Sequence, residues 1–246
     1  MRRRTLTDLA NNPDLISGIY NYCDRWCERC PLTSRCLVYA TEQEDDNNSF
    51  PGNDLRNEAF WQKLSVIFQE TREMSVEWAK DAGVDLNSSS DEDDSRQNRK
   101  RQLVDNHPLT KAGKKYANAA SDWFRELDQM FEVSENFEQL EDAREVVQWY
   151  QYQIAVKTMR ALSGRKEELD EDPEIVEFPK DSDGSAKVAL IGIDRSIAAW
   201  RMMQLSLPER TASIVPLILQ LERLRNRLEK AFPEARDFVR PGFDET

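Results

Sequence analysis

The chain has 246 residues, which is enough for one large domain or two small ones. Its formal net charge of −12 repels nucleic acid over most of the surface, so we expect no nucleic-acid partner. It holds only 8 glycines, about half the usual frequency, and it lacks sustained two-residue alternation of apolar and polar side chains. Both features favour helices over a sheet.

The N-terminal region has no features of a secretory or membrane segment. No apolar run approaches the roughly 20 residues that a membrane helix needs. Residues 5–16 include two asparagines, two aspartates and a proline, which excludes the apolar core of a signal peptide. We therefore expect a cytoplasmic protein with no membrane partner, in a compartment where thiols stay reduced and disulfides are disfavoured.

The first half of the chain predicts three helices separated by polar breaks. We expect one helix at about 13–30, ended by Pro31, and a short one after Cys36. After an acidic, asparagine-rich break at 43–51, an amphipathic helix begins at 53 and stops near Gly83. Residues 87–102 contain no apolar side chain, so we expect a mobile loop at about 87–107.

The second half predicts four further helices. They are expected at 108–131, 134–164, 184–204 and 208–232, with a mobile loop at about 165–183 and an irregular tail from 233. The whole pattern predicts an all-α fold, a helical bundle of four to five main helices with an N-terminal helix-turn segment that holds four cysteines. The corresponding domains are 1–50 for the cysteine-bearing part, 51–232 for the bundle and 233–246 for the tail.

All four cysteines of the chain fall in one short stretch. Cys23, Cys27, Cys30 and Cys36 have the spacing C-x3-C-x2-C-x5-C, a clustering that chance would rarely produce. A turn after Pro31 would bring the fourth thiol back toward the other three. The pattern favours a metal centre. Two alternatives stay open: buried inert thiols on the apolar face of the 13–30 helix, and a redox or disulfide role.

The spacing favours an iron–sulfur cluster over zinc. Structural zinc usually joins two C-x2-4-C knuckles a dozen or more residues apart, whereas iron–sulfur clusters often take ligands from tight runs. If the segment were helical, the α-carbons of Cys23 and Cys30 would lie about 10 Å apart, a span that suits a cluster better than one ion. We prefer [4Fe–4S] to Zn²⁺. Three interleaved arginines would offset the thiolate charge or pair with neighbouring acids.

The first three cysteines resemble the C-x3-C-x2-C signature of radical S-adenosylmethionine enzymes, over eight residues. That family has a β/α barrel with the cysteines on a loop after the first strand. The last three cysteines similarly resemble part of the auxiliary-cluster motifs of such enzymes, over ten residues. Because this sequence has no βα repeats, we carry over neither function.

A second candidate site lies in the two most apolar helices. The 184–204 helix is apolar nearly all round and should be buried, yet it carries charges including Asp194 and Arg195. If it packs on the 134–164 helix, Asp194 would pair with Lys157 or Arg160. These four residues form either a polar network that fixes helix register or a pocket for a small or anionic ligand. A di-metal site built from Glu-x-x-His pairs needs at least two histidines, and this chain has only His107, so we expect no such site.

Three functions remain as expectations. The leading one is an iron–sulfur protein that acts as a sensor, an electron-transfer partner or an accessory subunit. The second is an adaptor whose cysteines hold structural zinc and whose acidic surface binds a protein partner. The third is an enzyme or small-ligand binder that uses the charged pocket of the bundle. The sequence does not decide whether the protein is an enzyme.

Overall fold

The computed structural model describes residues 12–46, 69, 72–73, 75–77, 79–80, 83, 91–128, 137–170 and 181–244. These residues form helices and turns and contain no strand, which confirms the predicted all-α class. The chain divides into two compact units. Met1–Tyr20 with Arg25–Arg96 form the N-terminal unit, and Asn21–Asp24 with Gln97–Thr246 form the bundle unit. None of the described helices has an apolar stretch long enough to span a bilayer.

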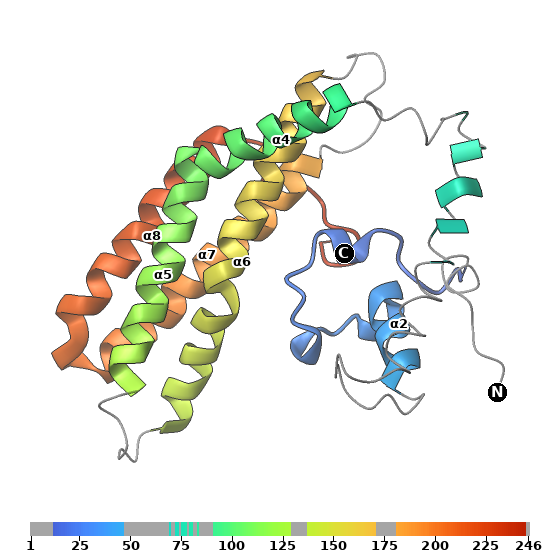
Figure 1. The fold of residues 1–246 in the computed structure, drawn as a ribbon. Helices are drawn as coiled ribbons and strands as arrows, with labels where there is room; N and C mark the ends of the chain where they lie inside the picture. The colour runs from blue at the N-terminus through green and yellow to red at the C-terminus, as the bar shows by residue number, and fades with distance from the viewer. Residues whose placement is uncertain are drawn as a thin grey trace, which may run out of the picture. The chain divides into compact units, whose positions relative to one another are not determined.

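Four long helices make the bundle unit. They are α5 (Pro108–Asp128), α6 (Phe137–Asp170), α7 (Asp181–Ser206) and α8 (Thr211–Ala231). α7 packs along α6 and also contacts α8, while α5 contacts α6 and α8 (Figure 1). The predicted bundle of four to five main helices is therefore confirmed.

An aromatic cluster fills one part of the bundle core. Trp200 lies edge-on to Trp123 at 4.9 Å between ring centroids and stacks on Phe124 at 5.4 Å. The indole nitrogen of Trp200 donates a hydrogen bond to the Tyr116 hydroxyl at 2.9 Å, so the buried polar atoms are satisfied. The cluster joins α5 to α7.

Small residues let the helices approach closely. A Cβ atom added to Gly192 of α7 would lie 3.0 Å from the Tyr150 ring of α6 and 3.2 Å from Ile154. On α5, a Cβ at Gly113 would lie 3.1 Å from the Ala155 backbone. The first contact brings α7 close to α6, and the second brings α5 close to α6. α7 itself is buried around most of its circumference, as its apolar sequence predicts.

Two loops of the bundle were predicted too long. The loop expected at about 87–107 is wrong, because α4 (Asp91–Asn106) is a 16-residue helix. Its arginine, lysine and glutamine residues are good helix formers, and among its described side chains, 95–106, only Val104 is buried, so it gives no apolar period. The loop expected at 165–183 is also too long. α6 continues to Asp170 and α7 begins at Asp181, while 171–180 lie outside the described residues.

The N-terminal helix expected at 13–30 is wrong. The chain instead makes the 3-10 turns η1 (Ile19–Asn21), η2 (Cys27–Arg29) and η3 (Thr33–Arg35). Gly18 has φ +71° and Arg25 has φ +57°, and a residue in this left-handed region interrupts an α-helix. The short helix predicted after Cys36 is confirmed as α2 (Leu37–Asp46).

The helix predicted from residue 53 lies only partly within the described residues, whereas the last predicted helix lies wholly within them. Of the amphipathic helix predicted from 53, the described residues 69, 72–73, 75–77 and 79–80 are helical, and the rest lies outside them. Gly83 has φ +67°, as a residue following a helix end often does. The last predicted helix is confirmed as η5 (Pro208–Arg210) followed by α8, and the described part of the tail, 233–244, consists of turns and irregular backbone.

Candidate functional site: the cysteine turns and the docked stretch Asn21–Asp24

Short turns, rather than one helix, carry the cysteines of the N-terminal unit. The backbone N–H of Cys30 donates to the carbonyl of Cys27 at 3.1 Å, and that of Cys36 donates to the carbonyl of Thr33 at 3.2 Å. Cys27 and Cys30 therefore flank one turn, and Cys36 ends the next. All four cysteines, Cys23 included, are half-buried and none forms a disulfide.

Hydrogen bonds within the N-terminal unit hold these turns. The N–H of Ile16 donates to the carbonyl of Arg35 at 2.9 Å, and the Arg35 side chain donates to the carbonyl of Asp14 at 3.4 Å. Trp26 is buried, and the Arg29 guanidinium lies 4.2 Å from the centre of its ring. These contacts join the start of the cysteine-bearing chain to its end and fix the turn at Cys27.

The stretch Asn21–Asp24, which contains Cys23, packs within the bundle unit, and we call it the docked stretch. The carboxylate of Asp24 accepts a hydrogen bond from Arg195 Nη1 at 2.7 Å and another from the Tyr150 hydroxyl. Its backbone carbonyl accepts bonds from Trp149 Nε1, at 2.9 Å, and from the Gln153 side chain. Four side chains of α6 and α7 thus converge on one residue.

Further contacts fix the other end of the docked stretch. Lys157 Nζ donates to the carbonyl of Asn21 at 3.2 Å, and Arg160 Nη1 donates to the same oxygen at 3.5 Å. The Tyr22 ring packs on Phe238 at 4.7 Å between centroids. Tyr22 also lies directly on Gly184 of α7, where an added Cβ would be 2.3 Å from the ring. The close approach requires glycine at 184.

Burial sets the protonation of the phenol in this site. Burial raises the pKa of Tyr150 well above its usual range, and the hydrogen bond to the Asp24 carboxylate raises it further. At neutral pH Tyr150 is therefore a neutral donor. Burial alone would lower the pKa of Arg195, but its bonds to Tyr150 and Asp24 raise it, so this guanidinium stays charged. The result is a charge-assisted clamp on Asp24.

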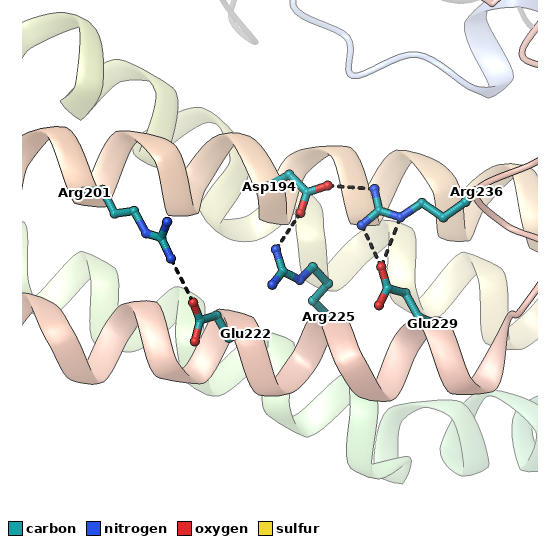
Figure 2. A network of polar contacts seen from close by, with 6 residues as sticks. All are labelled: Asp194, Arg201, Glu222, Arg225, Glu229 and Arg236. Carbon is teal, nitrogen blue, oxygen red and sulfur yellow. Dashed lines mark hydrogen bonds and ion pairs between the residues drawn. The ribbon is translucent and has the colours of Figure 1, made fainter.

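The structure brings three of the four residues of the predicted pocket together and separates the fourth, Asp194. Lys157, Arg160 and Arg195 all donate to the docked stretch. Asp194 instead points to the side of α7 that faces α8, where Arg225 Nη1 lies at 3.2 Å and Arg236 Nη1 at 2.7 Å from its carboxylate (Figure 2). The expected pairing of Asp194 with Lys157 or Arg160 is wrong. Successive helix residues differ by about 100° in direction, so Asp194 and Arg195 serve different faces.

Sequence reasoning missed most of the acceptors and donors of this site. Asp24, Trp149 and Gln153 carry no local pattern that points to one another, because more than a hundred residues separate Asp24 from the helix that binds it. Two of the three arginines that lie between the cysteines, Arg25 and Arg29, have partners that the sequence did not indicate. Arg25 lies 3.4 Å from Glu42, and Arg29 covers Trp26.

The geometry leaves the metal prediction open. Among the described residues, no three or more His, Cys, Asp or Glu side chains lie together in a way that would hold a metal ion. The α-carbon spacing expected for a cluster requires a helix from Cys23 to Cys30, and the chain forms no helix over that range but a 3-10 turn at Cys27–Arg29. The four-cysteine centre stays a prediction from the spacing of the thiols.

The described fold is an all-α bundle with a docked N-terminal stretch. No protein-family model, no curated protein and no solved structure matches this chain.

Proposed function

We propose that Cys23, Cys27, Cys30 and Cys36 bind a [4Fe–4S] cluster, in a protein that serves as a sensor, an electron-transfer partner or an accessory subunit. The observation that carries this proposal is the confinement of every cysteine of the chain to positions 23–36, where none of them forms a disulfide. Tight runs of this kind are a common source of cluster ligands.

The local backbone supports this role. Cys27, Cys30 and Cys36 begin or end short 3-10 turns rather than lying inside a rigid helix. Turns of two or three residues can adjust at low cost, and metal binding is generally coupled to the folding of the segment that supplies the ligands. Thiolates converge only when a cation offsets their mutual repulsion.

Contacts with the bundle helices fix the backbone around Cys23, the first of the four proposed cysteine ligands. Cys23 lies between Tyr22, which packs on Gly184, and Asp24, which accepts four hydrogen bonds from α6 and α7. Such contacts restrict the backbone on both sides of Cys23. A ligand whose backbone is fixed in advance loses less conformational entropy on binding. In this proposal, Asp24 and Arg195 are positioning residues and not ligands.

A structural zinc site in a protein-binding adaptor is the second candidate. The Cys27–Cys30 turn, with the N–H of Cys30 bonded to the carbonyl of Cys27, matches the C-x2-C spacing of a zinc knuckle. The acidic surface would then bind the partner protein. An enzyme in the bundle is the third, and it is less supported because Lys157, Arg160 and Arg195 are engaged by the docked stretch.

Cysteine substitution tests which residues hold the metal. We expect Cys23→Ser, Cys27→Ser, Cys30→Ser and Cys36→Ser, purified without oxygen, each to lose most of the bound metal while the bundle keeps its helical circular dichroism. Ser34→Ala, in the turn between Cys30 and Cys36, is the matched control and should keep full occupancy. If all four cysteine variants retain the metal content of the wild type, both metal proposals are wrong.

A further inference from the structure

Five exposed cations lie on the outer surface of α5 and α8, and we call them the basic patch. They are Lys111 and Lys115 of α5 and Arg223, Arg227 and Lys230 of α8. Within the part of the chain that the structure describes, none of their side chains forms an ion pair or a hydrogen bond. Acidic residues outnumber basic ones by 46 to 34 in this chain, so a group of unpaired cations is unexpected.

The packing of α5 against α8 brings the five cations to one end of the bundle. The two helices lie side by side and antiparallel (Figure 1). Trp123, near the end of α5, donates through Nε1 to the hydroxyl of Ser213, near the start of α8, at 2.9 Å. At a rise of about 1.5 Å per residue, Lys115 lies about 12 Å along α5 from Trp123. Arg223 lies about 15 Å along α8 from Ser213, at nearly the same level as Lys115.

The cations of the two helices also occupy adjoining faces. At about 100° per residue, Lys115 lies about 80° around α5 from Trp123, which contacts α8. Arg227 lies about 40° around α8 from Ser213, which contacts α5, and about 160° from Arg225, which pairs with α7. The basic patch therefore covers the line where α5 meets α8, and the ion pairs between α7 and α8 lie on a different side of the bundle.

Helix stability does not account for these charges. Lys111 is the fourth residue of α5, where the helix dipole disfavours positive charge, and no acidic residue lies in that first turn. Lys111 with Lys115, and Arg223 with Arg227, are like-charge pairs four residues apart, and such pairs destabilise a helix. Of the five cations, Lys230 alone lies in the last turn of its helix, where the dipole favours it. A partner explains these positions better than the folding of the bundle does.

We propose that the basic patch binds a short acidic segment of a partner protein. Arg223 and Arg227 lie about 6 Å apart along α8, and each guanidinium matches the two oxygens of one carboxylate. Leu219 precedes Arg223 by one turn on the same face and is 41% exposed, so it offers the segment an apolar contact. This proposal does not depend on the metal centre.

The charge of the whole chain favours a short partner over an extended one. The net charge is −12 with the basic patch included, so the rest of the chain is more negative still. A nucleic-acid duplex or an anionic bilayer extends beyond the patch and is repelled by that excess of carboxylates. A segment of a few residues contacts the patch alone. Phosphate groups also offer nothing apolar to pack on Leu219.

Fluorescence anisotropy tests the proposal, with a short labelled peptide of glutamate and leucine titrated with the full-length chain. The same peptide with glutamine in place of glutamate, a labelled oligothymidine and vesicles that contain anionic lipid are measured in parallel at matched ionic strength. We expect saturable binding of the glutamate peptide that weakens as salt is added. The other three probes should bind more weakly.

Arg223→Gln combined with Arg227→Gln should weaken binding of the glutamate peptide about tenfold or more, because it removes two charge-assisted contacts. Both side chains are exposed and unpaired in the described structure, so the fold should stay intact. The melting temperature should not fall, since the substitution also removes a like-charge pair. Leu219→Ala should weaken peptide binding and leave its salt dependence unchanged.

The matched control is Arg125→Gln, which removes an exposed arginine of α5 that pairs with Asp122. It should bind the glutamate peptide as the wild type does. The proposal is overturned if the glutamate peptide gives no saturable binding, or if the glutamine peptide, oligothymidine or vesicles bind as tightly. It is also overturned if Arg125→Gln weakens binding as much as the double substitution does.

Discussion

Replacing Gly184 by alanine tests the docking of the Asn21–Asp24 stretch on the bundle. The added Cβ would lie 2.3 and 2.5 Å from two ring carbons of Tyr22 and 2.7 Å from the end of the Phe238 ring. Contacts this short force one or both aromatic rings to move. Overpacking of this kind costs about 1–3 kcal/mol, and the better helix propensity of alanine returns up to about 1 kcal/mol. We therefore expect Gly184→Ala to lower the free energy of unfolding by about 1–2 kcal/mol.

Gly164→Ala is the matched control for this change. It lies on α6 opposite the start of α7, and its Cβ would meet the Ser182 backbone at 3.4 Å, an ordinary van der Waals distance. We expect this variant to be as stable as the wild type or slightly more so. For a protein of this size, each kcal/mol shifts the melting temperature by about 2–4 °C, so Gly184→Ala should melt roughly 2–8 °C lower.

Thermal unfolding gives the melting temperatures of the two variants, and amide hydrogen exchange shows whether the loss of stability is confined to the docked stretch. Protection at Asn21–Asp24 should fall in Gly184→Ala and stay unchanged in Gly164→Ala. Equal melting temperatures and equal protection for the two alanine variants would refute the docking of Tyr22 on α7.

Three further predictions concern single hydrogen bonds of the bundle unit. Asp24→Ala removes the side-chain acceptor of Tyr150 and should lower the free energy of unfolding in urea by about 1–2 kcal/mol. Most of this loss comes from the bond to Tyr150, because the Arg195 side chain is 54% exposed; an unchanged value would contradict the clamp. The raised pKa of Tyr150 means that the folded state holds the phenol proton more tightly than the unfolded state. The protonated phenol therefore stabilises the fold, and this contribution is fully present below about pH 10 and is lost progressively as the pH rises above it. Urea unfolding of Tyr150→Phe should therefore show a smaller loss between pH 9 and 11 (roughly spanning the ordinary tyrosine pKa) than the wild type, and identical slopes would argue against it. Tyr116→Phe leaves the Trp200 indole N–H without its acceptor and should cost about 1–3 kcal/mol in the same assay, whereas Tyr152→Phe, which changes an exposed hydroxyl, should cost much less; equal losses would contradict the buried bond.

The helices of the bundle were predictable where burial leaves a periodic pattern. α5 and α8 each bury one face, and their predicted starts at Pro108 and Pro208 match the structure to within a few residues. α4 buries only Val104 of its described side chains, so a search for apolar periodicity could not find it. The start of α7 was predicted three residues late because its first residues are polar or small, although Ser182 and Asp183 are buried in the fold.

The candidate site was only partly predictable. Charges within apolar helices correctly marked Lys157, Arg160, Asp194 and Arg195 as residues that need partners, and each has one. The identity of the partners was not predictable, because Asn21 and Asp24 contribute through backbone carbonyls and a carboxylate far away in the chain. The expected helix at 13–30 failed because Arg25 adopts a left-handed backbone that propensity does not favour.

The identity of the bound metal tests the central proposal most directly. Iron, zinc and acid-labile sulfide are to be counted in full-length protein purified without oxygen, and its visible spectrum recorded. We predict about four irons and about four sulfides per chain with the broad visible absorbance of an iron–sulfur cluster. A colourless protein with about one zinc per chain would replace the cluster by the structural zinc site. A protein that contains neither metal would contradict the four-cysteine centre itself.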